Sequence, residues 1–452
     1  MKIIHLAIFT CGLFTSSAYG GDAEKELIGK IVDAYGGHAV SEIKKLKIEN
    51  KYKTPAVGQS ASPSQLDIGV LKDRVVVDFV NKRVSEISWT LSNNGPRLGE
   101  RFNNGQTGHS INYMRGTHVD REDYTFHRVA GGNLRMLDLG LVKLLASNPE
   151  GAVLGDKLYL KGRLHQALTF PMPETSGITI YVDVDSYLIS KMTRSGELSY
   201  VYSDYQEVDG VKYAGSTDFF IGAQPNMLSL SRNLTVNPNV VGEFEMPEGI
   251  KTIPGGMLDT SKMMTKEVAD GVFLVGQRAG FSMFVDAGDY FIGVGGYPKL
   301  TERFNAVKEL DGLNKPLKFQ VVTHHHSDHI AGLDEAIELG AKLVTVRTHV
   351  QPLKAALGDE GIEAKLLLVD EKVSLADGKV KLFNIATSHS DQFLLFYMPE
   401  EQLIFSADHF STQVKNALPG PSFGAVTFLR ALERLNVEIK TLYDAHTPHV
   451  FT

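Results

Sequence analysis

The segment at residues 319–329 decides the fold of the C-terminal half of this chain, and it reads FQVVTHHHSDH. An apolar stretch with the pattern of a strand is followed by four histidines and an aspartate within six positions. His324 and His326 are two residues apart, so on an extended backbone their side chains point the same way. Asp328 and His329 lie where the chain turns into a predicted helix, so they can face a second point nearby. Imidazole and carboxylate groups suit zinc and its first-row neighbours, so the segment predicts a metal site.

Three later residues, each in a short loop after a predicted strand, are further candidate ligands. His389 follows the strand pattern at 382–386, Asp408 follows 403–406, and His446 follows 442–443. Taken alone, each would be an ordinary polar residue. Together with the first segment they complete two clusters, and this is why we include them.

Strand and helix patterns alternate around these residues, which favours an α/β layer structure. The expected strands are 271–275, 281–285, 319–323, 379–385, 393–398 and 403–406, and the expected helices are 301–310, 333–339 and 425–435.

The order of these residues resembles the metallo-β-lactamase superfamily over residues 258–452. The matching features are His-x-His-x-Asp-His, a later His, an Asp in a Ser-Ala-Asp context after a strand, and a final His. The resemblance implies an αββα sandwich with the site at one sheet edge. It also implies that His324, His326 and His389 bind a first metal ion, that Asp328, His329 and His446 bind a second, and that Asp408 bridges the two.

Two departures from the family pattern affect this carry-over. The predicted strand at 290–294 runs into Gly295 and Gly296, where the family usually has a structural aspartate, so we expect a rearranged loop there. His446 stands in the sequence DAHTP instead of before the usual glycine, which makes it the weakest of the seven assignments. No cysteine is available as a second-site ligand, which points away from the antibiotic-degrading subclass that uses one and towards thioesterases, lactonases and phosphodiesterases.

The chemistry implied by the resemblance is hydrolysis through a hydroxide that bridges two metal ions about 3.5–4 Å apart. Metal binding lowers the pKa of water to about 7, which gives a nucleophile at neutral pH. Asp328 is the candidate catalytic residue, because it could bind metal and also orient or deprotonate the water. The expected cofactors are two divalent metal ions, zinc first, with iron or manganese as alternatives.

The N-terminus predicts export. Met1 and Lys2 precede an apolar run to Phe14 and then small residues that end at Gly20, which is typical of a signal peptide over residues 1–20. The signal peptide implies a periplasmic or secreted protein. The only cysteine, Cys11, lies inside the signal peptide, so the mature chain would have no disulfide, which suits a bacterial periplasm better than a disulfide-rich extracellular setting. A net charge of −7 over 452 residues gives no basic surface for nucleic acid. No later segment is apolar enough to span a membrane.

Residues 21–250 predict a mostly antiparallel β domain with one N-terminal helix at 23–35. Turn signals of the Asn-Gly and Asp-Gly type separate β-rich runs, for example at Asn93-Asn94-Gly95 and Asp209-Gly210. The Pro- and Gly-rich residues 251–257 are the predicted linker to the domain at 258–452. Short features such as Tyr35-Gly36-Gly37 weakly resemble lipoprotein-carrier half-barrels, which implies a lipid-like ligand; a docking or substrate-shaping role is the alternative.

The sequence therefore predicts an exported dinuclear metal hydrolase that acts on an ester, thioester, lactone or related bond of a small molecule, with a lipophilic substrate as one option. Two alternatives stay open. The same scaffold could carry one iron ion and act as a persulfide-type dioxygenase. The chain could instead be a lipophile-binding protein with an incidental C-terminal domain, although a complete ligand set argues against this.

Overall fold

The computed structural model describes residues 21–174, 176–195, 197–254, 258–278, 280–412, 414, 418–420 and 422–451. The predicted signal peptide at 1–20 lies outside the described residues, and so do residues 255–257 of the predicted linker. Among the described residues, no helix is long and apolar enough to cross a membrane.

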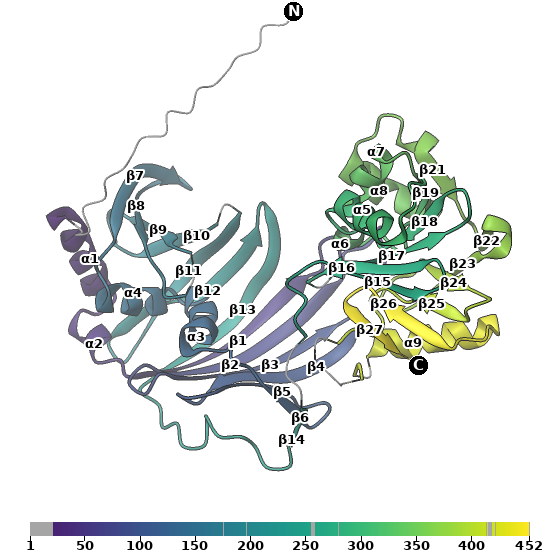
Figure 1. Ribbon diagram of the computed structural model, residues 1–452. Coiled ribbons are helices and arrows are strands. Elements are labelled where there is room, and N and C mark those ends of the chain that lie inside the picture. The colour runs from purple at the N-terminus through teal and green to yellow at the C-terminus, as the bar shows by residue number, and fades with distance from the viewer. Residues whose placement is uncertain are drawn as a thin grey trace, which may run out of the picture. The chain divides into compact units, whose positions relative to one another are not determined.

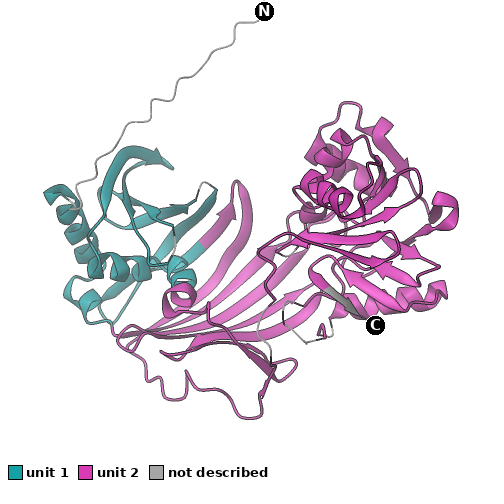
Figure 2. Ribbon diagram, viewed as in Figure 1, with its two compact units in different colours: residues 1–43, 131–217 teal, residues 44–130, 218–452 magenta. Residues whose placement is uncertain are grey.

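The chain divides into two compact units, shown in different colours in Figure 2. One consists of Met1–Ile43 and Gly131–Thr217, and the other of Lys44–Ala130 and Asp218–Thr452. Residues 44–130 thus share a unit with the C-terminal half. The domain boundary that we place at 251–257 stays a prediction.

The first unit packs helices against an antiparallel sheet, as the alternating sequence runs predict. The N-terminal helix begins at Asp22 and buries Ile28 and Ile31. Strand order in this unit is β11-β10-β9-β8-β7. The elements are α1 (Asp22–Ala34), α2 (His38–Ser41), α4 (Asp138–Ser147), β7 (Val153–Leu160), β8 (Arg163–Phe170), β9 (Ile178–Asp183), β10 (Ile189–Arg194) and β11 (Leu198–Val208).

Besides the four-residue α2, two longer helices in the N-terminal half were not predicted from the sequence. The first, α3 (Phe126–Arg135), contains Gly131 and Gly132, which disfavour a helix. The second, α4, is apolar on most sides and buries five consecutive residues from Asp138 to Val142, so it lacks the one-sided periodicity that marks a surface helix. Tertiary packing outweighs the local signal in both.

A buried carboxylate ties the first unit together. Asp138 is fully buried and accepts a hydrogen bond of 2.6 Å from the Tyr35 hydroxyl and one of 2.8 Å from the Ala214 amide. The Tyr35 hydroxyl in turn accepts a bond of 3.1 Å from the Ile189 amide. Burial, together with the Asp138 charge, raises the pKa of Tyr35 well above its usual value, so its hydroxyl stays protonated and donates.

The second unit begins with a long antiparallel sheet whose outer pair, β14 and β6, is parallel. Strand order is β14-β6-β5-β4-β3-β2-β1-β13. The predicted turn at Asn93–Gly95 joins β3 to β4, with Gly95 at a φ of 88°. The elements are β1 (Lys45–Pro55), β2 (Ile68–Asp78), β3 (Arg83–Ser92), β4 (Gly95–Asn103), β5 (Gly108–Asn112), β6 (Thr117–Asp120), β13 (Gln224–Val236) and β14 (Lys251–Thr252); β12 (Val211–Ile221) runs across the boundary between the units.

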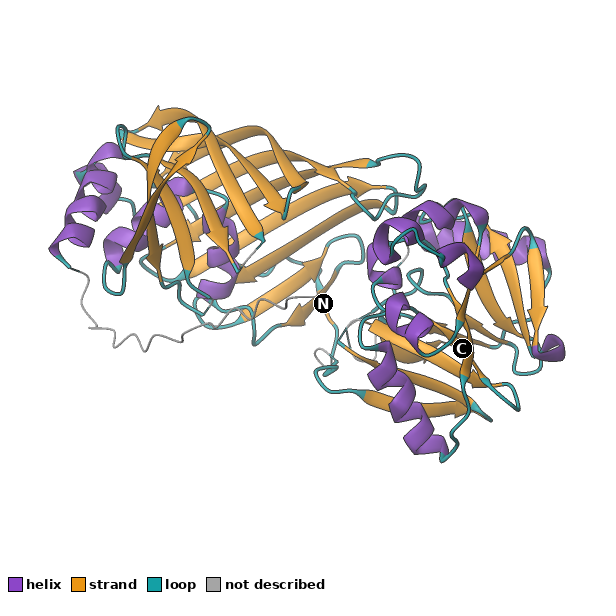
Figure 3. Cartoon of the chain, turned by 90° about the horizontal axis from the view of Figure 1, so that it is seen from above, coloured by secondary structure: helices purple, strands orange, loops and turns teal. Residues whose placement is uncertain are grey.

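The C-terminal part is a four-layer αββα sandwich, as predicted (Figures 1 and 3). Strand order is β15-β16-β17-β18-β19-β20-β21 in one sheet and β22-β23-β24-β25-β26-β27 in the other. Phe281, Phe393 and Phe405 belong to one cluster of buried residues, to which α9 adds Phe428. Helices α5 and α7 cover the outer face of the first sheet through Phe304 and Leu333.

Where an element of the sandwich was predicted, its bounds agree with the predicted ones to within a few residues. Several elements were not predicted, namely β15, β20, β21, β22, β27, α6 and α8. The strands are β15 (Met264–Ala269), β16 (Val272–Gln277), β17 (Gly280–Asp286), β18 (Phe291–Val294), β19 (Leu317–Val321), β20 (Lys342–Thr345), β21 (Leu366–Leu368), β22 (Lys372–Leu375), β23 (Val380–Ile385), β24 (Phe393–Met398), β25 (Leu403–Phe405), β26 (Thr441–Asp444) and β27 (Thr447–Phe451). The helices are α5 (Leu300–Asp311), α6 (Ser327–Ile330), α7 (Leu333–Glu338), α8 (Val350–Leu357) and α9 (Phe423–Leu435), with short 3-10 turns at Arg347–His349, Ile362–Lys365 and Ala376–Gly378.

Replacing Asp138 with alanine should destabilise the first unit by about 3 kcal/mol, because two buried donors lose their acceptor. Hydrogen exchange of the Ala214 amide and urea unfolding followed by circular dichroism measure the effect. Asp156→Ala, at an exposed position on β7, is the control and should change stability by less than about 0.5 kcal/mol. Equal stability of the two variants would contradict the role assigned to Asp138.

Candidate metal centre

The motif after β19 places alternate histidines on opposite sides of the backbone, as the two-residue spacing predicts. The rings of His324 and His326 have centroids 4.4 Å apart and face the same cluster, whereas His325 packs near the His349 ring at 5.5 Å. Asp328 and His329 follow within α6, a helix of four residues that begins at Ser327. The strand end thus aims four side chains at two neighbouring points.

The structure brings all seven predicted ligands together in two groups that share Asp408. Within each group, one nitrogen or carboxylate oxygen of every residue lies within 4.8 Å of the others. The first group is His324, His326, His389 and Asp408, and the second is Asp328, His329, His446 and Asp408.

The carboxylate of Asp408 lies between the two groups with one oxygen towards each. Its Oδ2 is 3.1 Å from His389 Nε2 and 3.7 Å from His324 Nε2. Its Oδ1 is 2.7 Å from His329 Nε2 and 3.0 Å from His446 Nε2. This is the placement expected of a residue that contacts two cations at once.

Local turns hold the three loop residues in place. Ala407 takes a left-handed φ of 49° just before Asp408, and its carbonyl accepts from the Ala445 amide at 2.9 Å. The Asp444 carboxylate accepts from the His446 amide at 2.9 Å, which forms the tight turn before β27. Thr387 Oγ1 accepts from the His389 amide at 3.2 Å.

Burial keeps His324 and His326 uncharged. Desolvation lowers the pKa of His324 well below its usual value and that of His326 to about 2, so both rings are neutral at pH 7. Burial alone would raise the pKa of Asp408, but the neighbouring His329, His324 and His389 hold that pKa well below its usual range. Neutral imidazoles and an ionised carboxylate are the forms that bind metal ions.

The hydrogen bonding of the buried histidine nitrogens also fits a bound metal ion. The Nε2 atoms of His324 and His389 are 3.1 Å apart in the buried cluster. His326 Nδ1 is buried and, among the described residues, has no hydrogen-bond partner. A buried unpaired nitrogen beside two facing imidazoles is costly without a cation to bind them.

Tyr297 belongs to the centre although no local pattern pointed to it. Its hydroxyl lies 3.2 Å from His329 Nε2 and 3.4 Å from His446 Nε2. Burial, and after it the Asp408 charge, raises the pKa of Tyr297 well above its usual value, so the hydroxyl stays protonated. Tyr297 directly follows the Gly295-Gly296 pair at which we expected a changed loop. Gly296 allows a close approach to α6, since a Cβ atom there would lie 2.4 Å from the His329 carbonyl oxygen.

Residues from the long sheet of the second unit also contact the centre, and no sequence pattern predicted them. Gln59 and Ser60 lie in the loop between β1 and β2, and Asn94 lies in the turn between β3 and β4. They form hydrogen bonds with Asp328, His326 and His389. Because they precede their partners by more than 260 residues, only the fold could show the contacts.

A pocket of about 530 Å³ opens beside His326 and His389. Its walls come from the same loop and turn and from the start of β13. Four amide side chains line it, from Gln59, Asn93, Asn94 and Asn226, together with apolar groups such as Ile68 and Met227. Asp67 is the only carboxylate among the described lining residues, which include neither lysine nor arginine.

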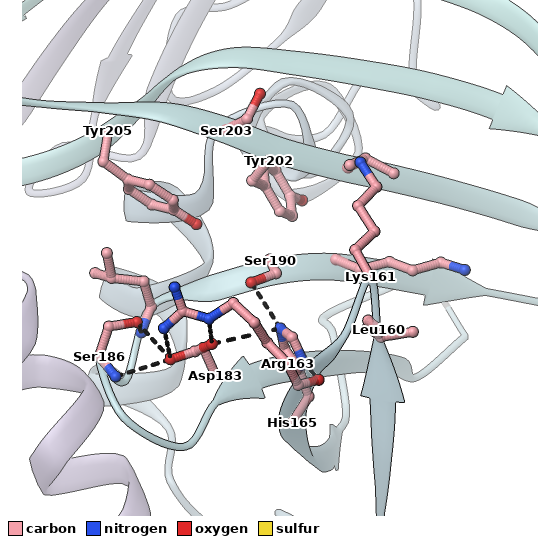
Figure 4. Close-up of a pocket in the computed structure, with 13 residues that line it drawn as sticks. Leu160, Lys161, Arg163, His165, Asp183, Ser186, Ser190, Tyr202, Ser203 and Tyr205 are labelled. Atoms are coloured by element: carbon pink, nitrogen blue, oxygen red, sulfur yellow. Dashed lines mark hydrogen bonds and ion pairs between the residues drawn. The ribbon is translucent and has the colours of Figure 1, made fainter.

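The first unit has a pocket of its own, about 510 Å³ in volume (Figure 4). Leu160, Leu188 and Val201 are among its apolar lining residues. Arg163 forms a two-point ion pair with Asp183, at 2.6 and 2.9 Å.

Comparison with known proteins finds a family match within the C-terminal half. Residues 295–441 match the model of the metallo-β-lactamase superfamily. The matched range contains six of the seven predicted ligands and ends before His446. A curated relative, a β-lactamase-like protein 2 homologue from Caenorhabditis elegans, is 27% identical over 147 residues, which cover 30% of this chain and 48% of the relative. The chain thus spans about half the length of that relative.

Solved structures with a similar part include the metallo-β-lactamase FIM-1 from Pseudomonas aeruginosa in its mono-zinc form, with 18% identity, 42% of this chain and 90% of that chain covered, and a TM-score of 0.34. The metallo-β-lactamase DIM-1 is 15% identical over 42% of this chain and 91% of its own, with a TM-score of 0.33. A flavodiiron protein from Giardia intestinalis is 22% identical over 41% of this chain and 55% of its own, with a TM-score of 0.33.

Proposed function

The C-terminal half of the chain contains a domain of the metallo-β-lactamase superfamily, and from this premise we propose that the protein is a metal-dependent hydrolase with a dinuclear centre. His324, His326 and His389 would hold the first ion, and Asp328, His329 and His446 the second. Asp408 would contact both. We propose zinc as the metal, and export of the protein through residues 1–20.

One observation supports two ions over one. The two oxygens of Asp408 face different groups of histidines, at 3.1 Å from His389 on one side and 2.7 Å from His329 on the other. Two cations held close together repel each other, and a shared carboxylate offsets that repulsion. A single ion would leave one of the two groups without a metal ion.

Each residue has a task that follows from its charge state. Metal ions bound here would activate a water molecule and polarise the bond to be cleaved. Asp328 is the most exposed of the candidate ligands, with 39% of its side chain accessible, so it can orient a water molecule and accept a proton. The protonated Tyr297 hydroxyl can donate to the second group or to a developing negative charge.

The pocket beside the first group supports an uncharged carbonyl substrate. Its amide side chains can hydrogen-bond to neutral polar groups, while Ile68 and Met227 can contact apolar ones. An anionic arm would meet the Asp67 carboxylate and no lysine or arginine among the described lining residues. Esters, thioesters and lactones fit this lining better than phosphodiesters do.

Asp408→Ala should lower metal content and hydrolysis together, because both ions lose a shared ligand. Metal analysis and turnover of nitrophenyl and thiol esters measure the two effects; hydrolysis should fall by at least about 100-fold. His446→Ala should empty mainly the second site. Asp334→Ala, an exposed carboxylate on α7, serves as the control. Full metal content in Asp408→Ala would argue against the proposed bridge.

The charge of the pocket predicts a preference between two matched substrates, the 4-nitrophenyl esters of succinamic acid and of succinic acid. They differ only in an amide in place of a carboxylate. The amide ester should have a kcat/KM about 10-fold higher, equivalent to about 1.4 kcal/mol. Met227→Lys should narrow the difference by adding a cation, whereas Met114→Lys, at an exposed site away from the lining, should not. Faster cleavage of the carboxylate ester by the wild type would refute this prediction.

A further inference from the structure

Three of the seven candidate ligands form hydrogen bonds with residues in the loops of the long N-terminal sheet. This sheet and the sandwich belong to the same compact unit (Figure 2). His326 Nε2 lies 2.9 Å from the Ser60 carbonyl oxygen. His389 Nδ1 lies 3.3 Å from Asn94 Oδ1. The Gln59 amide donates to Asp328 Oδ1 at 2.8 Å. One contact falls on the second group and two fall on the first.

The Ser60 contact selects the tautomer of His326. A carbonyl oxygen can only accept, so the proton of the neutral ring must lie on Nε2. The lone pair is then on Nδ1, which is the buried nitrogen that has no partner among the described residues. Ser60 itself is only 5% exposed, so the acceptor is sheltered from water. The loop between β1 and β2 therefore presents Nδ1 of His326 to the centre.

The Asn94 contact does the same for His389 through the opposite nitrogen. Asn94 Oδ1 accepts from Nδ1–H, which leaves the lone pair on Nε2. That Nε2 is the atom that lies 3.1 Å from both His324 Nε2 and Asp408 Oδ2. The turn is held against the sandwich because the Phe423 amide donates to the Asn94 carbonyl oxygen at 3.3 Å. The next residue, Gly95, combines its φ of 88° with a close approach to Phe423.

The Gln59 contact fixes the carboxylate of Asp328. With Oδ1 bound by the Gln59 amide, Oδ2 is the oxygen that faces His329 and His446, at 3.5 and 3.7 Å. The loop is tied to the sandwich by two backbone bonds. The Ser327 amide donates to the Gly58 carbonyl oxygen at 3.0 Å, and the Asp391 amide donates to that of Ala61 at 2.8 Å.

We infer that the loop at residues 56–67 and the turn at residues 93–95 are positioning elements of the metal centre. They fix the tautomer of His326 and His389 and the orientation of Asp328, so metal affinity depends on a sheet that lies outside the metallo-β-lactamase match. This inference rests on the proposed metal-binding function and assigns Gln59 and Asn94 as positioning residues. Partners of this kind typically change metal affinity by about 10- to 100-fold.

The test measures zinc affinity of the full-length chain by competition with a chromophoric chelator. Asn94→Ala should raise the zinc Kd of the first site, and Gln59→Ala that of the second, each by about 10-fold or more. Asn94→Asp keeps an acceptor for the His389 N–H, so it should retain the wild-type affinity. Asn112→Ala removes an exposed amide from β5 of the same sheet and is the matched control.

The outcomes separate this inference from the proposed function. Wild-type zinc affinity in both Asn94→Ala and Gln59→Ala would overturn the inference while leaving the metal centre intact. A wild-type chain that binds no metal would overturn the proposed function instead. Thermal melts of the metal-free variants show whether they fold. If Asn94→Ala does not fold, Asn94→Asp decides the question: a loss of zinc affinity in that variant would count against a role for Asn94 as the hydrogen-bond acceptor of His389.

Discussion

The geometry of the centre depends on one buried carboxylate held between two sets of imidazoles. Asp408 stays ionised despite its burial because His329, His324 and His389 surround it and lower its pKa. In return, its two oxygens give the histidines of both groups a common anionic neighbour. Removing a charge from water costs several kcal/mol unless partners compensate for it. Metal cations bound by the groups around Asp408 would therefore compensate the rest of its negative charge.

The sandwich supplies the rigidity that this arrangement requires. Every candidate ligand follows a strand whose side chains lie in the closely packed core between the sheets, for example β19 before His324 and β25 before Asp408. Because a closely packed interior deforms little, the loops that begin at these strand ends have little freedom to move. Ala407 can keep a left-handed backbone because the Ala445 amide bonds its carbonyl.

The sequence was informative where the evidence is local. Strand and helix periodicity predicted an α/β layer structure, and the two-residue spacing of His324 and His326 predicted the direction of both side chains. The αββα sandwich itself was implied by the family resemblance. Tyr297, Gln59 and Asn94 could not be predicted, because an isolated tyrosine or amide carries no spacing signal and their partners are distant in sequence. Likewise, α4 went unrecognised because burial on most sides removes the periodicity on which helix prediction depends.

The number and kind of metal ions in the purified wild-type chain test the account most directly. Elemental analysis should find about two zinc-like ions per chain, because the two groups around Asp408 offer two sets of ligands. Oxygen uptake, measured in parallel with a persulfide, should be absent. A single iron ion per chain together with oxygen consumption would contradict the account.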